Sequence, residues 1–181
     1  MGAEVSPVTR VHGTLVEVAG VGVLLLGQSG IGKSECAIEL VLRGWRFVAD
    51  DVVLLHAAPA GGLIGEGPEL VRHHVELRGI GIVHLPSLFG AGCVADSGRV
   101  ELVVELVPWG RGEVERVGIE GKTRELAGSE VPCVQLPVAP GRNVATLVEV
   151  AAREFRRRQE GNVAASALDA RILETLRRGE S

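Results

Sequence analysis

The residues best suited to chemistry lie between Gly27 and Ser34, in the sequence GQSGIGKS. This stretch fits the pattern G-x-x-x-x-G-K-[ST], in which backbone N–H groups surround phosphate oxygens, the lysine neutralises them and the last hydroxyl binds Mg²⁺. The match is specific, because the chain has 25 glycines but only two lysines, and Lys33 stands at the required position. The pattern predicts a phosphate-binding loop made of Gly27, Gln28, Ser29, Gly30, Ile31, Gly32, Lys33 and Ser34.

Two adjacent carboxylates, Asp50 and Asp51, are the next candidates. They interrupt the apolar stretch RFVADDVVLLHA at 46–57, which predicts one strand covered on both faces. If this strand lies beside the strand of the phosphate loop, one carboxylate would hold Mg²⁺ through water and the other would accept a proton from an attacking hydroxyl. The alternative is a single metal-linked Asp whose neighbour faces solvent. Because side chains alternate along a strand, both can face the site only where the strand has just ended.

Regular elements must position these groups. Apolar runs predict strands at 11–18 and 21–26, and helical spacing of apolar residues predicts a helix from Lys33 to Arg43, with Gly44 as its C-terminal cap. A glycine-rich loop is expected at 58–68. Further strand character lies at 75–85, 99–109 and 133–140, and helices are expected at 143–159, with Asn143 as N-cap, and at about 164–178. The order predicts one α/β domain over 1–181, ending in a helical segment at about 143–178.

Composition narrows the class of protein. The net charge of −4 is spread along the chain, which argues against nucleic acid or an anionic membrane as a partner. No apolar run approaches the ~20 residues of a membrane span, so we expect a cytoplasmic protein. Three cysteines, Cys36, Cys93 and Cys133, are far apart and lack CxxC spacing, which predicts free thiols rather than disulfides or a zinc site.

Seven segments together resemble a known family. They occur in the order seen in the catalytic domain of HPr kinase/phosphorylase and span about residues 9 to 152. The segments are VHG at 11–13, GQSGIGKSE at 27–35, RGWRFVADD at 43–51, HHVELRGIGI at 73–82, LFGAG at 88–92, ERVG at 115–118 and PVAPGRN at 137–143. A chance phosphate loop would bring none of the other six segments.

The resemblance implies a fold, an activity and partners. The fold would be the α/β P-loop kinase type similar to phosphoenolpyruvate carboxykinase, with C-terminal helices. The activity would be an ATP- and Mg²⁺-dependent kinase acting on a serine of the phosphocarrier protein HPr, which many members reverse by phosphorolysis, producing pyrophosphate. Family members assemble as hexamers. Because this chain starts almost at the catalytic domain, we expect a short form without the N-terminal domain of many members.

The resemblance also implies roles for single residues. The implied catalytic residues are His12, Lys33, Asp50 and Arg116, with Lys33 on the β and γ phosphates, Asp50 as proton acceptor, His12 supporting Asp50 and Arg116 steadying the transferred phosphate. Ser34 and Glu76 would hold Mg²⁺, and we assign Asp51 to the metal with them. On residue chemistry alone, His12 is more typical of a hydrogen-bonded core histidine on a strand. Glu76 with Arg78 is, on the same ground, more typical of an ordinary surface ion pair.

The chain departs from the family pattern at two places. Gln28 occupies a loop position that is often acidic in relatives, which changes charge beside the phosphates but removes no backbone donor. The segment tied to dephosphorylation comprises Pro137, Val138, Ala139, Pro140, Gly141 and Arg142, and relatives usually carry Arg or Lys in place of Ala139. Since a cation is missing there, we expect the kinase activity to be retained and phosphorolysis to be weak.

Two other functions are open on the sequence. A small-molecule kinase or carboxykinase-like phosphotransferase would use the same fold and loop. A nucleotide-sensing regulator would bind ATP and a partner without chemistry, although a sensor needs no proton acceptor.

Overall fold

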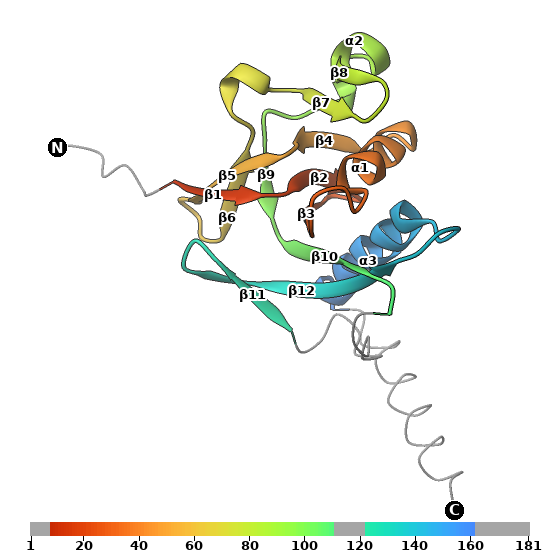
Figure 1. Cartoon of the computed structure of the whole chain (residues 1–181). Coiled ribbons are helices and arrows are strands. Elements are labelled where there is room, and N and C mark those ends of the chain that lie inside the picture. Colours follow the sequence, from red (N-terminus) through yellow and green to blue (C-terminus); the bar gives the residue numbers. More distant parts are fainter. Residues whose placement is uncertain (1–7, 111–121, 162–181) are drawn as a thin grey trace, which may run out of the picture.

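The architecture is known from a computed structural model that describes residues 8–110 and 122–161. Its centre is a six-stranded mixed sheet with strand order β11-β12-β10-β3-β2-β4 (Figure 1). The strands of this sheet are β2 (Thr14–Val18), β3 (Val21–Leu26), β4 (Arg46–Ala49), β10 (Leu102–Pro108), β11 (Thr123–Leu126) and β12 (Ser129–Val138). Strands β3, β10 and β12 run parallel, and the other pairs are antiparallel.

Smaller elements surround this sheet. A four-stranded antiparallel sheet has the order β1-β5-β6-β9, and β7 pairs with β8 as a separate hairpin. These strands are β1 (Thr9–His12), β5 (Val52–Ala57), β6 (Leu63–Glu66), β7 (His74–Leu77), β8 (Gly81–His84) and β9 (Ser97–Val100). The helices are α1 (Lys33–Leu42), α2 (Leu85–Phe89) and α3 (Val144–Gln159), with 3₁₀ turns at Glu69–Val71 and Ala91–Cys93.

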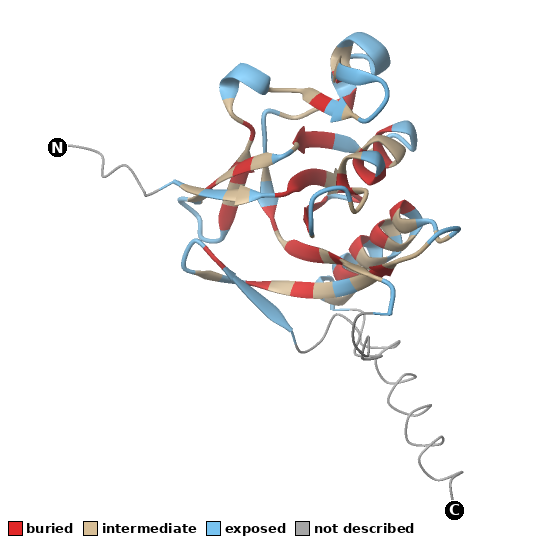
Figure 2. Ribbon diagram, in the orientation of Figure 1, coloured by how far each residue is buried: buried red, intermediate tan, exposed pale blue. Residues whose placement is uncertain are grey.

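The central sheet separates two hydrophobic cores because its side chains alternate between its faces. Val16 of β2 and Leu25 of β3 face the side covered by α1 and α3. Their neighbours Leu15 and Leu24 face the four-stranded sheet. Figure 2 shows buried positions along the central strands and on the helices that cover them. The phosphate loop therefore lies at the end of a strand that is packed on both faces.

The predicted strand, loop and helix around the phosphate loop are confirmed. Strand β3 ends at Leu26, and α1 begins at Lys33 after Gly32, whose φ of 102° suits glycine. Helix α1 ends at Leu42, and Gly44 follows with a φ of 91°. The predicted N-cap of α3 is also confirmed, because Asn143 Oδ1 accepts a hydrogen bond from Thr146 N at 2.7 Å.

Two stretches predicted as single strands are each divided between the two sheets. Residues 11–18 break at Gly13 into β1 and β2, and residues 46–57 break at Asp50 and Asp51 into β4 and β5. The two breaks lie side by side, since Gly13 N donates a hydrogen bond to Asp51 O at 3.2 Å. Apolar residues continue through both breaks because the chain passes from one buried sheet into another. The expectation of continuous strands was therefore wrong.

Other boundaries also differ from expectation. Strand β4 was expected beside β3, but β2 lies between them. The glycine-rich loop at 58–68 contains strand β6, and the segments at 75–85 and 99–109 hold the β7–β8 hairpin and the pair β9 and β10. Arg116 and the helix expected at about 164–178 lie outside the described residues.

The cysteines and the helices bear on two further expectations. Cys36, Cys93 and Cys133 are all free and buried, as predicted. Burial raises the pKa of the Cys36 thiol to about 12, so this thiol stays protonated and unreactive near neutral pH. In the part of the chain that the structure describes, no helix is long and apolar enough to cross a membrane.

Gly22 is a position where the fold tolerates no side chain. Its backbone exchanges hydrogen bonds with Glu101, and a Cβ placed on it would lie 1.5 Å from Arg99 O. We expect Gly22→Ala to lower the free energy of unfolding by about 3 kcal/mol or more, because backbone must move to relieve the overlap. Urea unfolding measures this change. Gly92→Ala is the matched control, since nothing lies within 4 Å of a Cβ there, and equal losses for both variants would contradict the prediction.

Candidate active site

The phosphate loop connects β3 to α1 and has a tightly constrained start. Gly27 has a φ of 142°, and a Cβ there would lie 2.6 Å from Leu106 O of β10. Lys33 is 7% exposed, and its Nζ donates hydrogen bonds to Gly27 O at 2.8 Å and Gln28 O at 3.1 Å. The lysine therefore holds the loop around its own ammonium group, at the N-terminal end of a helix where anions bind.

The charge of Lys33 depends on two opposing effects. Burial lowers the pKa of its ammonium group, and nearby carboxylates, chiefly Asp50 and then Asp51, oppose that change. Desolvation is the larger effect, so the isolated ammonium is not fully compensated by its surroundings. A bound polyphosphate would supply the missing negative charge.

Asp50 is held by two hydroxyl groups. Its Oδ1 accepts a hydrogen bond from Thr14 Oγ1 at 2.5 Å, and its Oδ2 accepts one from Ser34 Oγ at 2.8 Å. Thr14 is fully buried, which fixes one side of the carboxylate. Both carboxylate oxygens are therefore engaged in positioning, and Asp50 orients the serine that ends the phosphate loop.

Asp51 is placed quite differently. Its backbone is left-handed, with a φ of 66°, at the break between β4 and β5. Its side chain is 76% exposed, and its Oδ1 lies 3.0 Å from His12 Nδ1. The resemblance implied that His12 supports Asp50, whereas the hydrogen-bonded breaks of the two chain segments place His12 beside Asp51 in this structure.

These groups line one open cavity of about 220 Å³. Glu76 of β7 and the nearby Arg78 close it from the side of the hairpin. The Arg78 guanidinium lies over the phosphate loop, since a Cβ on Gly30 would be 3.0 Å from Arg78 Nη2. The cavity wall thus comprises His12, Ser29, Gly30, Gly32, Lys33, Ser34, Glu35, Asp50, Asp51, Glu76 and Arg78.

The donor set of the cavity suits Mg²⁺. Ser34, Asp50, Asp51 and Glu76 present oxygen atoms, which are the ligands that Mg²⁺ prefers. Among the described residues, no three His, Cys, Asp or Glu side chains are close enough to hold a metal ion alone. A Mg²⁺ ion here would therefore need phosphate oxygens and water as well, which is how Mg²⁺ binds in nucleotide sites.

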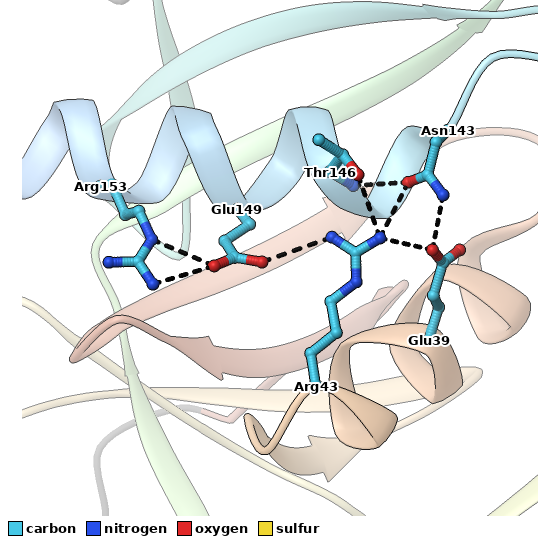
Figure 3. A network of polar contacts seen from close by, with 6 residues as sticks. All are labelled: Glu39, Arg43, Asn143, Thr146, Glu149 and Arg153. Carbon is cyan, nitrogen blue, oxygen red and sulfur yellow. Dashed lines mark hydrogen bonds and ion pairs between the residues drawn. The ribbon is translucent and has the colours of Figure 1, made fainter.

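No residue of the segment 137–142 is among those that line this cavity. Pro137 and Val138 end β12, and the following residues lead into α3. A polar network fixes the start of α3 to α1 (Figure 3): Arg43 donates hydrogen bonds to Glu39, Asn143, Thr146 and Glu149, Asn143 Nδ2 donates to Glu39, and Arg153 donates to Glu149.

Most of the predicted site residues meet. His12, Lys33, Ser34, Asp50, Asp51 and Glu76 line the same cavity. Arg116 lies outside the described residues. Sequence reasoning missed Thr14 as the anchor of Asp50. The available signal was a polar residue at the start of an apolar strand, because a buried hydroxyl requires a hydrogen-bond partner.

Comparisons with known proteins give a consistent result. The family model of the HPr Serine kinase C-terminal domain matches residues 3–172. The HPr kinase/phosphorylase of Caldicellulosiruptor bescii is 49% identical over 177 residues, covering 97% of this chain and 57% of that protein. The Bacillus subtilis protein of the same name is 42% identical over 179 residues, covering 98% of this chain and 58% of that protein.

A solved structure extends the likeness to three dimensions. The HPr(Ser) kinase/phosphatase of Coxiella burnetii matches with a TM-score of 0.79 and 31% identity, over 88% of this chain and 98% of that one. This match confirms the predicted α/β P-loop kinase fold. The chain spans a little over half the length of the curated relatives it matches, at 57% and 58%.

Proposed function

Since the chain belongs to the HPr serine kinase C-terminal domain family, we propose that it transfers the γ-phosphoryl group of ATP to a serine of an HPr-like phosphocarrier protein. The observation that supports this most is the set of groups around one cavity: a buried lysine in a phosphate loop, a hydroxyl for the metal and an exposed carboxylate. A sensor without chemistry would need only the first two of these.

In this mechanism the two carboxylates have separate roles. Asp51 accepts the proton of the attacking serine hydroxyl, because its side chain is exposed to the cavity and open to a protein substrate. His12 orients that carboxylate through Nδ1 and, when protonated, stabilises its charge. Asp50 holds Ser34 in place and would act on a bound Mg²⁺ through that serine. These roles exchange those that the family resemblance first indicated for Asp50 and Asp51.

The remaining groups bind the donor. Lys33 carries positive charge to the β and γ phosphates, and the backbone N–H groups of the loop bind their oxygens. Mg²⁺, when bound, would supply positive charge that neutralises these phosphates. Ser34 and Glu76 would hold the ion, with Asp50 acting through Ser34. Arg116 is proposed as a further cation on the transferred group.

We also propose a hexameric assembly, as the family resemblance implies. Four large apolar side chains are exposed on the β7–β8 hairpin and α2, two elements that lie together at the top of Figure 1: Ile80, Ile82, Leu88 and Phe89. Such a patch is more typical of a contact surface than of a face left in water. Sedimentation of the purified chain tests the proposal.

The proposed kinase activity has a direct test. Incubating the chain with ATP, Mg²⁺ and the HPr-like protein of the same organism should add one phosphoryl group to that protein. Intact-mass spectrometry detects the adduct, and peptide mapping should place it on serine. Adducts on other residues, or turnover of a small molecule without the protein acceptor, would contradict the proposal. Adding inorganic phosphate to the phosphorylated product then tests phosphorolysis, which we propose is slow because Ala139 replaces a cation.

A further inference from the structure

A second cavity of about 380 Å³ lies beside the first. It is bounded by the phosphate loop and α1 on one side and by the β12–α3 connection on the other. Ile31, Val138 and Val144 give it apolar walls, and Glu35 and Arg142 add charged groups. Its size and mixed walls are those of a small-molecule site. The kinase step proposed above uses none of this space, although Val138, Gly141 and Arg142 belong to the segment that the family resemblance ties to dephosphorylation.

The two cavities adjoin through the phosphate loop. Gly32 and Glu35 line both of them. A phosphate chain held by Lys33 in the first cavity can therefore continue past Gly32 into the second without crossing the protein core. A group attached to the far end of the phosphate chain must therefore lie either in the second cavity or in solvent.

We infer that the second cavity binds the nucleoside half of the phosphate donor, its ribose and base. This inference rests on the proposed function, because it assumes that a nucleoside triphosphate enters the phosphate loop. Ile31 and Val138 line this cavity and offer apolar contacts to a base, and the exposed Glu35 carboxylate can accept hydrogen bonds from ribose hydroxyl groups. The connection 139–143 and the phosphate loop therefore both contribute to this site.

The walls of the second cavity are fixed before any ligand binds. Arg43 and Asn143 both donate hydrogen bonds to Glu39, which joins α1 to the start of α3 (Figure 3). Arg142 is held beside the cavity by its stacking on Trp109, with Cζ 5.5 Å from the ring centre. A preformed site costs little conformational entropy on binding, so the nucleoside should add affinity beyond that of the phosphates.

Filling the cavity tests the inference. Val144 lines it at the first position of α3, so Val144→Phe should place a ring where the nucleoside would lie. We expect the Kd of MgATP to rise roughly tenfold or more, and the Kd of magnesium tripolyphosphate to stay within about twofold. Titration calorimetry measures both ligands. Val150→Phe is the matched control, since Val150 is exposed on the same helix and away from the cavity.

A second variant covers the case in which Val144→Phe does not fold. Glu35 is exposed, so Glu35→Gln should leave the fold intact while weakening MgATP relative to tripolyphosphate severalfold. Unchanged MgATP affinity in both variants would overturn the inference. Failure of the proposed function would look different: the unmodified chain would either bind neither MgATP nor tripolyphosphate, or bind both without phosphorylating the protein acceptor.

Discussion

Replacing Asp51 by Asn is expected to slow phosphoryl transfer to the protein acceptor by roughly 10²–10⁴-fold, the usual contribution of a general base. The amide cannot accept the serine proton, although it keeps the size of the side chain. Nucleotide binding should change little, because the Asp51 side chain is largely exposed and contacts His12 rather than the phosphate loop. Single-turnover phosphorylation, with MgATP affinity measured separately, distinguishes the two effects.

Two other Asp→Asn variants serve as comparisons for Asp51→Asn. Asp50→Asn should chiefly weaken MgATP binding, because Asp50 positions Ser34 and is anchored by Thr14. Asp96 is another exposed Asp that lies beside a histidine, 3.1 Å from His73 Nε2, so Asp96→Asn should leave both transfer and binding unchanged. If Asp50→Asn abolished phosphoryl transfer but still bound MgATP, and Asp51→Asn kept transfer, then Asp50 rather than Asp51 would be the proton acceptor.

The roles of Asp50 and Asp51 could not be assigned from the sequence for a physical reason. Local patterns gave the phosphate loop, because its chemistry and its strand and helix lie within a short stretch. Which of Asp50 and Asp51 contacts Ser34 and which contacts His12 depends on where the chain passes from one sheet to the other. Apolar residues continue on both sides of that point, so hydrophobicity carries no signal of it. The contact of Gly13 with Asp51, which is long-range, decides that His12 meets Asp51.

The same reasoning explains the rest of the site. Helix α3 and its cap could be predicted, because Asn143 precedes a helical pattern and bonds only three residues ahead. Its position against α1 could not, since it depends on Arg43 and Glu39, about one hundred residues away. The second cavity exists because of that long-range network. Spacing along the chain therefore predicted which residues belong to the active site. The points where the chain passes from one sheet to the other determine which of these residues contact one another.

Lys33→Met is expected to raise the Kd of MgATP by roughly 100-fold or more, because each hydrogen bond to a charged group is worth about 1.5–3 kcal/mol and the ammonium can make several to the phosphates. The loop would also lose the contacts of Nζ with Gly27 O and Gln28 O. Fluorescence or calorimetric titration measures the change. Lys122→Met is the matched control, since Lys122 is the other lysine of the chain and is exposed in the β11 region.

The pH dependence of nucleotide binding gives an independent check on Lys33. In the protein without nucleotide, burial holds the pKa of the Lys33 ammonium group below the ordinary lysine value, so deprotonation begins at a lower pH than for an exposed lysine. Bound phosphates favour the charged form, and MgATP affinity should therefore decline as pH rises through that lowered pKa. Lys33→Met has no such proton to lose. If its weak binding showed the same alkaline decline as the unmodified chain, another group would be responsible, and Lys33 would not be the cation that holds the phosphates.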